Sequence, residues 1–303
     1  MHLPAARRIP SLLPRLRPPT SPTPCRNAYH SVAASGFNDS ELYHSARPSY
    51  PPAAISHIQS IIPASESPAV MELGAGTGLF TAPMLDALSS GNQSFTYVAN
   101  EPNPKMHESL SPMLSPAVQL NTVPIGGAEK LTGTDFEFDL VIAAQSFHWF
   151  TPYPASFMEC RRLLKRGGAL VLTWNERDTT IPWIKDLEDE IITPLYPADN
   201  NAAPRQQSGK WEESFEHFLG NYYGNLHKET FRGDDSVVQR GHEQVMERVM
   251  SLSVVAGLED EGEKKKIAAR TREFLETHRD TKGREEDLEL RYFTDVYYTR
   301  TIG

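Results

Sequence analysis

The chain has few of the residues that build disulfides, metal sites and membrane spans. Its only cysteines, Cys25 and Cys160, stand far apart in 303 residues and lack partner spacing, which argues against a disulfide framework and a zinc site. The ten histidines show no ligand spacing with carboxylates, so we expect no bound metal. No apolar run is long enough to span a bilayer.

A surplus of basic residues is also missing. The net charge is -9 and no long basic face occurs, which argues against a nucleic-acid substrate. With 39% hydrophobic residues the chain can bury the core of one large domain with an elaboration. We therefore expect a small-molecule substrate. Nothing in the sequence fixes the oligomeric state, and the charged run 259–266 reads as a solvated helix face.

Acids are absent from the first 38 residues. Residues 1–35 contain five arginines and are rich in serine, threonine and proline, as mitochondrial transit peptides often are. Seven prolines between Pro4 and Pro24 instead favour a disordered cytosolic tail, because they interrupt an amphipathic helix. We predict a mitochondrial location, with the cytoplasm as the alternative.

A short apolar run, Ala69 to Leu73, ends in glycines at alternate positions, Gly74, Gly76 and Gly78. This pattern predicts a strand, a tight turn and a helix. Glycine suits such a turn because the backbone approaches a ligand closely and often adopts a positive φ.

A second strand, Phe95 to Ala99, is followed by an acid, Glu101. A carboxylate at the tip of that strand can accept hydrogen bonds from both hydroxyls of a ribose, each contributing about 1.5–3 kcal/mol. The two segments together therefore predict a site for an adenosine.

Spacing narrows the choice of adenosine cofactor. A dinucleotide fold needs a third glycine where Leu79 stands, and no Gly-Lys-Ser/Thr follows the turn to make a phosphate-binding loop. Glu72 would repel a phosphate but suits a cationic amino-acid group. A sulfonium nucleoside fits better than a phosphate-bearing one.

The run from Glu72 to Gly78, E-x-G-x-G-x-G, resembles motif I of the class I S-adenosylmethionine-dependent methyltransferases. The likeness covers roughly residues 37–303, and with ARPSYP, AAQSFHW and TWN it is similar to the subgroup of trans-aconitate methyltransferases, within the methyltransferase type 11 group. Arg166 and Thr132 depart from positions where proline is common. Further matching segments are GGAEKL (126–131), FDLVIAAQSFHWF (138–150) and RRLLKRGGALVLTWN (161–175).

The resemblance and the alternation of strands and helices imply an α/β fold, a doubly wound, mostly parallel seven-stranded sheet with a helical cap. Trp183, Trp211, Phe215 and Phe218 are expected to anchor the cap. We divide the chain into a leader (1–35), a helical segment over the cofactor (36–66), an S-adenosylmethionine-binding core (67–175), a mostly helical cap (176–286) and a returning antiparallel strand (287–303).

The resemblance also implies a set of site residues. The cofactor, S-adenosylmethionine, is expected to contact Glu72, Gly74, Ala75, Gly76, Gly78, Glu101, Ala128, Glu129 and Gln145. His148 and Trp149 are the catalytic candidates. The candidates for binding substrate are Arg47, Tyr50, Trp174 and Asn175.

Several of these residues have a plainer interpretation. His148 either contacts substrate or bonds a loop carbonyl and orders Trp149. Trp149 and Trp174 either offer a π face to the sulfonium or belong to the core. Arg47 and Arg177 either grip a carboxylate or only fix the chain locally.

The expected reaction is methyl transfer to a small molecule, best to a carboxylate oxygen of an organic acid. A carboxylate is ionised at neutral pH and needs no base, which suits a sequence without an evident acid-base pair near residue 148. An amine or phenol would need a base, and His148 is the nearby candidate. The alternatives are methylation of a quinone precursor and an inactive cofactor-binding partner protein.

Overall fold

The computed structural model describes residues 44–91, 94–111, 114, 118–121, 137–196, 205–232 and 238–302. Its centre is an eight-stranded sheet in the order β3-β2-β1-β4-β5-β8-β6, with β7 paired to β8 off this path. The strands are β1 (Ala69–Leu73), β2 (Thr96–Asn100), β3 (Val118–Asn121), β4 (Phe138–Ala144), β5 (Leu164–Arg177), β6 (His227–Phe231), β7 (Val238–Arg240) and β8 (Glu289–Arg300).

The strands from β3 to β5 run parallel, and β8 lies antiparallel between β5 and β6. The predicted doubly wound, mostly parallel α/β fold with a returning antiparallel strand is confirmed. Seven strands follow the main path of the sheet, and β7 is the addition. The parallel order places the carboxyl ends of β1, β2, β4 and β5 at one edge, where ligands of such sheets bind.

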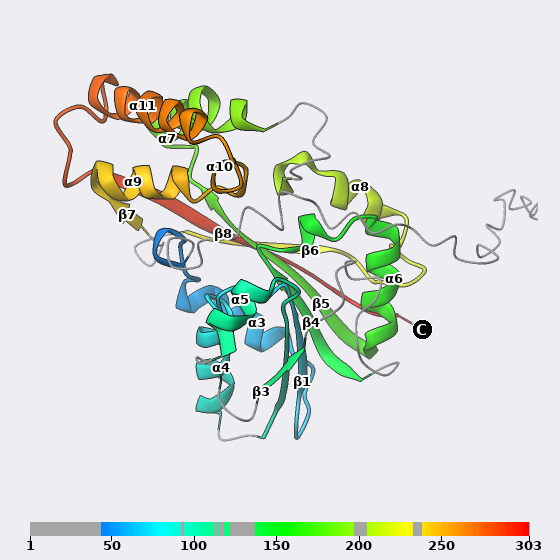
Figure 1. Cartoon of the computed structure of the whole chain (residues 1–303). Coiled ribbons are helices and arrows are strands. Elements are labelled where there is room, and N and C mark those ends of the chain that lie inside the picture. Colours follow the sequence, from blue (N-terminus) through cyan, green and yellow to red (C-terminus); the bar gives the residue numbers. More distant parts are fainter. Residues whose placement is uncertain are drawn as a thin grey trace, which may run out of the picture.

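Helices cover both faces of this sheet (Figure 1). The helices are α3 (Pro52–Ile61), α4 (Thr81–Ser90), α5 (Pro104–Leu110), α6 (Tyr153–Leu163), α7 (Pro182–Leu187), α8 (Lys210–Glu216), α9 (Gly241–Met250), α10 (Ser253–Ala256) and α11 (Glu261–Thr277). Shorter turns are η3 (Phe147–Trp149), η4 (Glu188–Ile192), η5 (Thr193–Leu195) and η6 (Gln206–Ser208).

Alternate residues of each central strand enter two separate cores. In β1, Val70 joins the cluster beneath α3 and α4, whereas Met71 and Leu73 join the cluster beneath α6 and α8. This follows from the two-residue period of a strand, which sends successive side chains to opposite faces. Both faces being covered, the strands read as continuous apolar runs.

A third cluster belongs to the cap. It joins Trp183 of α7 to α9, α10 and α11, and to the first residues of β8, Leu290 and Tyr292. These helices gather at one end of the long strand β8 (Figure 1). The expectation that Trp211, Phe215 and Phe218 also anchor the cap is wrong, because their rings pack with α6 against the sheet.

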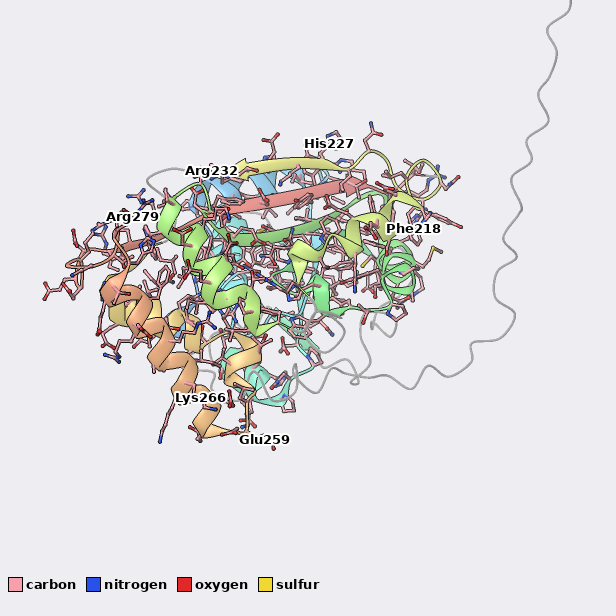
Figure 2. The ribbon with its side chains drawn as sticks, turned by 90° about the horizontal axis from the view of Figure 1, so that it is seen from above. Phe218, His227, Arg232, Glu259, Lys266 and Arg279 are labelled. Carbon is pink, nitrogen blue, oxygen red and sulfur yellow. The ribbon has the colours of Figure 1, made fainter. Side chains whose placement is uncertain are left out.

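The polar side of the cap is its outer helix, α11. The charged run 259–266 forms the exposed beginning of this helix, as predicted, with ion pairs one turn apart. Figure 2 shows Glu259 and Lys266 along this side of the molecule, away from β6, which begins at His227 and ends one residue before Arg232.

Candidate functional site

The glycine turn after β1 has the backbone that the sequence predicts. Gly74, Gly76 and Gly78 have φ angles of 68°, 60° and 88°. A Cβ on Gly74 would lie 2.7 Å from the Cβ of Ser146, so this glycine is required by close packing. A Cβ on Gly76 would meet nothing within 4 Å. The turn is thus open to a ligand on the side of Gly76, and Ala75 is buried beneath it.

Glu72 lies under this turn and faces inward. Its carboxylate accepts hydrogen bonds from the Thr81 hydroxyl and the Tyr97 hydroxyl, each at 2.7 Å. Burial raises its pKa from 4.5 to about 7, although both hydrogen bonds favour the ionised form. Glu72 therefore ties β1 to α4 and β2 within the structure.

Glu101 follows β2 and contacts the same turn. Its carboxylate accepts from the Gly76 N–H and from the Asn103 N–H, both at 2.7 Å. Burial raises its pKa to about 7 as well. The acid at the tip of the second strand thus lies against the open side of the glycine turn, the place where the sequence expects a ribose.

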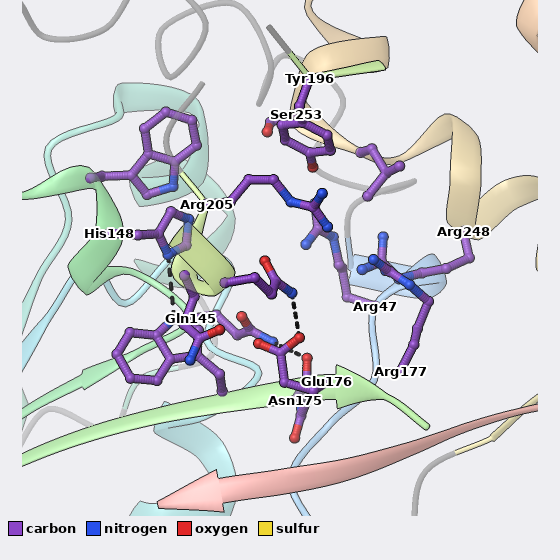
Figure 3. A pocket seen from close by; sticks show the side chains of 15 residues that line it. Arg47, Gln145, His148, Asn175, Glu176, Arg177, Tyr196, Arg205, Arg248 and Ser253 are labelled. Carbon is purple, nitrogen blue, oxygen red and sulfur yellow. Dashed lines mark hydrogen bonds between the residues drawn. The ribbon is translucent and has the colours of Figure 1, made fainter. Parts of the chain in front are cut away.

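An open pocket of about 650 Å³, including the solvent in its mouth, lies beyond the carboxyl ends of β4 and β5 (Figure 3). The sheet supplies its floor, and the cap and the turns around η5 and η6 supply its walls. Its lining residues are Arg47, Gln145, His148, Trp149, Trp174, Asn175, Glu176, Arg177, Tyr196, Arg205, Gln206, Gln207, Arg248, Leu252 and Ser253.

Gln145 stands where β4 ends and the pocket begins. With φ 56° it is the one non-glycine residue of the described chain in the left-handed region, a conformation that costs about 1–2 kcal/mol. Its N–H donates to the Thr173 carbonyl and its side-chain amide to the Asn175 carbonyl, each at 2.9 Å. These bonds hold the end of β4 against β5.

His148 is a neutral imidazole with a fixed tautomer. The Trp174 indole N–H donates to its Nδ1 at 3.3 Å, so the remaining proton belongs on Nε2. Burial, reinforced by Arg47 and Arg205, lowers the pKa of His148 to about 3. The hydrogen bond that His148 forms comes from Trp174 and is not the bond to a loop carbonyl, and its Nε2 presents a donor rather than a base.

The two tryptophans differ in exposure. Trp174 is 1% exposed, stacks on Trp211 at 5.1 Å between ring centroids and meets Tyr297 edge-on. Trp149 is half-buried beside His148, 5.2 Å from its ring, and lines the pocket. Core packing accounts for Trp174, while Trp149 offers a face to the pocket.

Among the described residues that line this pocket, four are arginines and one is a carboxylic acid (Figure 3). Glu188, behind the lining, pairs with Arg177 at 2.6 Å and with Arg205 at 2.5 Å. Arg47 donates to the Ser251 carbonyl of the cap. The fourth, Arg248, is 5% exposed and bonds only neutral groups, the hydroxyls of Tyr292 and Ser251.

Burial shifts the pKa values of two ionisable groups that line this pocket. Burial lowers the pKa of Arg248 to about 10, and Arg47 and Arg177 add to the effect as like charges. Burial also raises the pKa of Glu176 to about 7 against the influence of Arg177 and of the Gln207 amide, which donates to it. The pocket is positive and favours an anionic ligand.

The remaining predicted site residues differ in whether they line the pocket. Asn175 lines the pocket, yet its side chain bonds the backbone of residues 48 and 49. Tyr50 does not line the pocket; it is buried against Phe80, beside the glycine turn. Ala128 and Glu129 lie outside the described residues.

Arg205 and Arg248 were missed by the sequence analysis. Arg248 carried a signal, since it shares with Val245 and Val249 the buried face of α9, where a charged residue is unusual. Arg205 carried none, because it sits in a polar stretch without periodicity. Among the described residues, no cluster of three or more His, Cys, Asp or Glu side chains suits a metal ion. In the same parts of the chain, no helix combines the length and apolarity needed to cross a membrane.

Residues 71–172 match the methyltransferase domain family. An uncharacterized methyltransferase-like protein of Schizosaccharomyces pombe is 32% identical over 235 residues, covering 78% of this chain and 83% of that protein. The uncharacterized methyltransferase Rv3342 of Mycobacterium tuberculosis is 37% identical over 150 residues, so the match covers 50% of this chain and only 55% of that relative's length.

Solved structures agree in fold. A protein assigned as a type II methyltransferase from Anaeromyxobacter dehalogenans superposes with a TM-score of 0.56 at 16% identity, covering 84% of this chain and 97% of that one. The YcgJ protein of Bacillus subtilis gives 0.51 at 13% identity, over 83% and 99% of the two chains. Sequence, glycine turn and sheet order together show that the chain belongs to the class I S-adenosylmethionine-dependent methyltransferases.

Proposed function

We propose that the protein binds S-adenosylmethionine at the glycine turn and transfers its methyl group to a carboxylate oxygen of a small organic acid. The space beside Gly76 and the carboxylate of Glu101 support the cofactor half. The cofactor supplies an activated methyl group, so the chain has to orient an acceptor and exclude water.

The observation that carries the acceptor half is Arg248. Within the described part of the chain no carboxylate lies within 4.0 Å of its guanidinium, although the group is almost fully buried. A buried charge is costly unless it is paired. A carboxylate in the pocket would supply the missing charge and could accept two parallel N–H bonds from such a fork.

The state of His148 supports the same acceptor. With a pKa of about 3 and Nδ1 already accepting from Trp174, His148 is poorly suited to remove a proton at neutral pH. A carboxylate oxygen has no proton to lose. The Nε2–H can instead donate to the acceptor and hold one of its oxygens.

A relative adds support from its name. The malonyl-[acyl-carrier protein] O-methyltransferase of Geobacter sulfurreducens is 27% identical over 145 residues, covering 47% of this chain and 49% of that protein. A malonyl group ends in a carboxylate. The name of this relative therefore describes O-methylation of an acid.

The test is turnover of methyl-labelled S-adenosylmethionine with a panel of organic acids and their amides. We expect label in an ester that mild alkali cleaves. Arg248→Met should lower kcat/KM roughly thirtyfold or more, which corresponds to a loss of about 2 kcal/mol of transition-state binding. Arg279→Met, on the exposed outer side of the cap, is the control and should leave kcat/KM unchanged.

Two outcomes would overturn the proposal. An alkali-stable methyl group on a ring carbon would point to a quinone precursor as acceptor. Tight cofactor binding without turnover on any acid or phenol would indicate an inactive partner protein.

A further inference from the structure

Residues 44–50 run between the two halves of the site. At one end His44 Nδ1 lies 3.1 Å from the hydroxyl of Thr77, inside the glycine turn. At the other end the Tyr50 ring meets Phe80 edge-on at 5.1 Å, just before α4. Between them Arg47 lines the acceptor pocket and donates to the Ser251 carbonyl of the cap. One short segment thus touches the cofactor turn, the pocket and the cap.

Asn175 holds this segment to the sheet. Its side-chain amide donates to the Ser49 carbonyl at 2.9 Å and to the Pro48 carbonyl at 3.3 Å. Its carbonyl oxygen accepts from the Thr294 hydroxyl at 2.6 Å, and Thr294 is its cross-strand partner in β8. Because both backbone partners are acceptors only, the orientation of the amide is fixed by chemistry.

The side-chain N–H groups of Asn175 already donate to backbone carbonyls of the segment. Asn175 is 7% exposed, and a carboxamide that already bonds two carbonyls has little left for a substrate. A second amide reinforces the attachment, since Gln239 donates to the Ala46 carbonyl at 3.3 Å. Residues 46–49 are therefore fastened along their backbone, leaving Arg47 and Tyr50 to project from a fixed base.

We infer that Asn175 is a positioning residue that holds residues 46–50 so that Tyr50 closes the cofactor turn and Arg47 faces the acceptor. Both ends of this inference rest on the proposed function, the cofactor end on its cofactor half and the acceptor end on its acceptor half, and the two halves are tested separately below. Replacing Asn175 by a residue without the amide frees two backbone carbonyls and lets the segment leave the turn. Cofactor affinity should then fall, although Asn175 lies on β5 and contacts no residue of the glycine turn through a hydrogen bond.

The experiment is calorimetric titration of the full chain with S-adenosylhomocysteine, which needs no knowledge of the acceptor. Asn175→Leu, similar in size and uncharged, removes all three hydrogen bonds of the amide, two of them to the segment, and we expect the Kd to rise about tenfold. Thr294→Val, which only loosens the amide, should raise it about threefold. Thr299→Val removes a hydroxyl of the same strand that bonds the Gly224 carbonyl instead, and should leave the Kd unchanged.

A double-mutant cycle separates positioning from general destabilisation. In a Tyr50→Ala background, Asn175→Leu should change the Kd by less than about twofold, because the ring that it positions is gone. An equal factor in both backgrounds, or no change from Asn175→Leu alone, would overturn the inference. If the cycle holds while no carboxylic acid is methylated, the proposed acceptor is wrong and the positioning role stands.

Discussion

Glu72→Gln should change how the stability of the protein depends on pH. Glu72 is 1% exposed, and its pKa in the folded chain is about 7, against 4.5 for an ordinary glutamate. Glutamine keeps an oxygen that can accept from Thr81 and Tyr97 and removes the ionisable group. The substitution therefore isolates the cost of a buried charge beneath the glycine turn.

The magnitude follows from the shift. The folded pKa lies above the unfolded one, so between pH 4.5 and about 7 the folded chain keeps a proton that the unfolded chain has released. The free energy of unfolding must fall as pH rises through this window and level off above it. At about 1.4 kcal/mol per pH unit across a window of about 2.5 pH units, the total from this one carboxyl is about 3.5 kcal/mol. Relative to wild type, the glutamine variant should gain that amount between pH 4.5 and pH 8.

Urea unfolding followed by circular dichroism at pH 5 and pH 8 measures the difference. Glu213→Gln, on the exposed side of α8, is the control and should give the same small difference at both values. A Glu72→Gln variant whose stability relative to wild type is the same at pH 5 and pH 8 would refute the argument that burial sets this pKa.

Three further predictions concern the site and the leader. Gly76→Val should abolish binding of S-adenosylhomocysteine, because a branched side chain would enter the open side of the turn at a φ of 60° that valine rarely adopts; retained binding would contradict a cofactor at that place. His148→Ala should leave that binding intact and lower turnover about tenfold, and unchanged turnover measured by methyl transfer would reduce His148 to a structural residue. A fluorescent protein fused after residue 303 should accumulate in mitochondria, as residues 1–35 predict, whereas a diffuse cytosolic signal would contradict it.

The core of the fold was predictable because buried parallel strands leave a strong local signal. The run Ala69 to Leu73 is β1 as the sequence delimits it, and the run Phe95 to Ala99 differs from β2 by one residue. The returning strand was expected within residues 287–303 and occupies Glu289–Arg300. In β1 and β2 mostly apolar residues fill two covered faces, whereas along the first half of β8 buried residues alternate with half-buried ones, so the sequence pattern of each strand agrees with its place in the sheet.

The sequence did not predict features that depend on contacts between distant parts of the chain. The edge strand β6 is almost wholly exposed, so its sequence, HKETF, shows no apolar face that would predict a strand. The cluster of four arginines forms from segments far apart in the chain, and no spacing along the sequence reveals it. Trp211, Phe215 and Phe218 were assigned to the cap because the chain around them is helical, and only the packing against α6 shows that they belong to the sheet.

The place of β8 has a consequence for biosynthesis. This strand lies inside the sheet, between β5 and β6, yet it follows every other described strand of the sheet in the chain. Until residues 289–300 leave the ribosome, β5 has an open edge that another chain could pair with, and β6 has nothing to join. The nascent protein must therefore wait in an incomplete state, and chaperone protection of the β5 edge should matter more for its yield than the speed at which its first strands assemble.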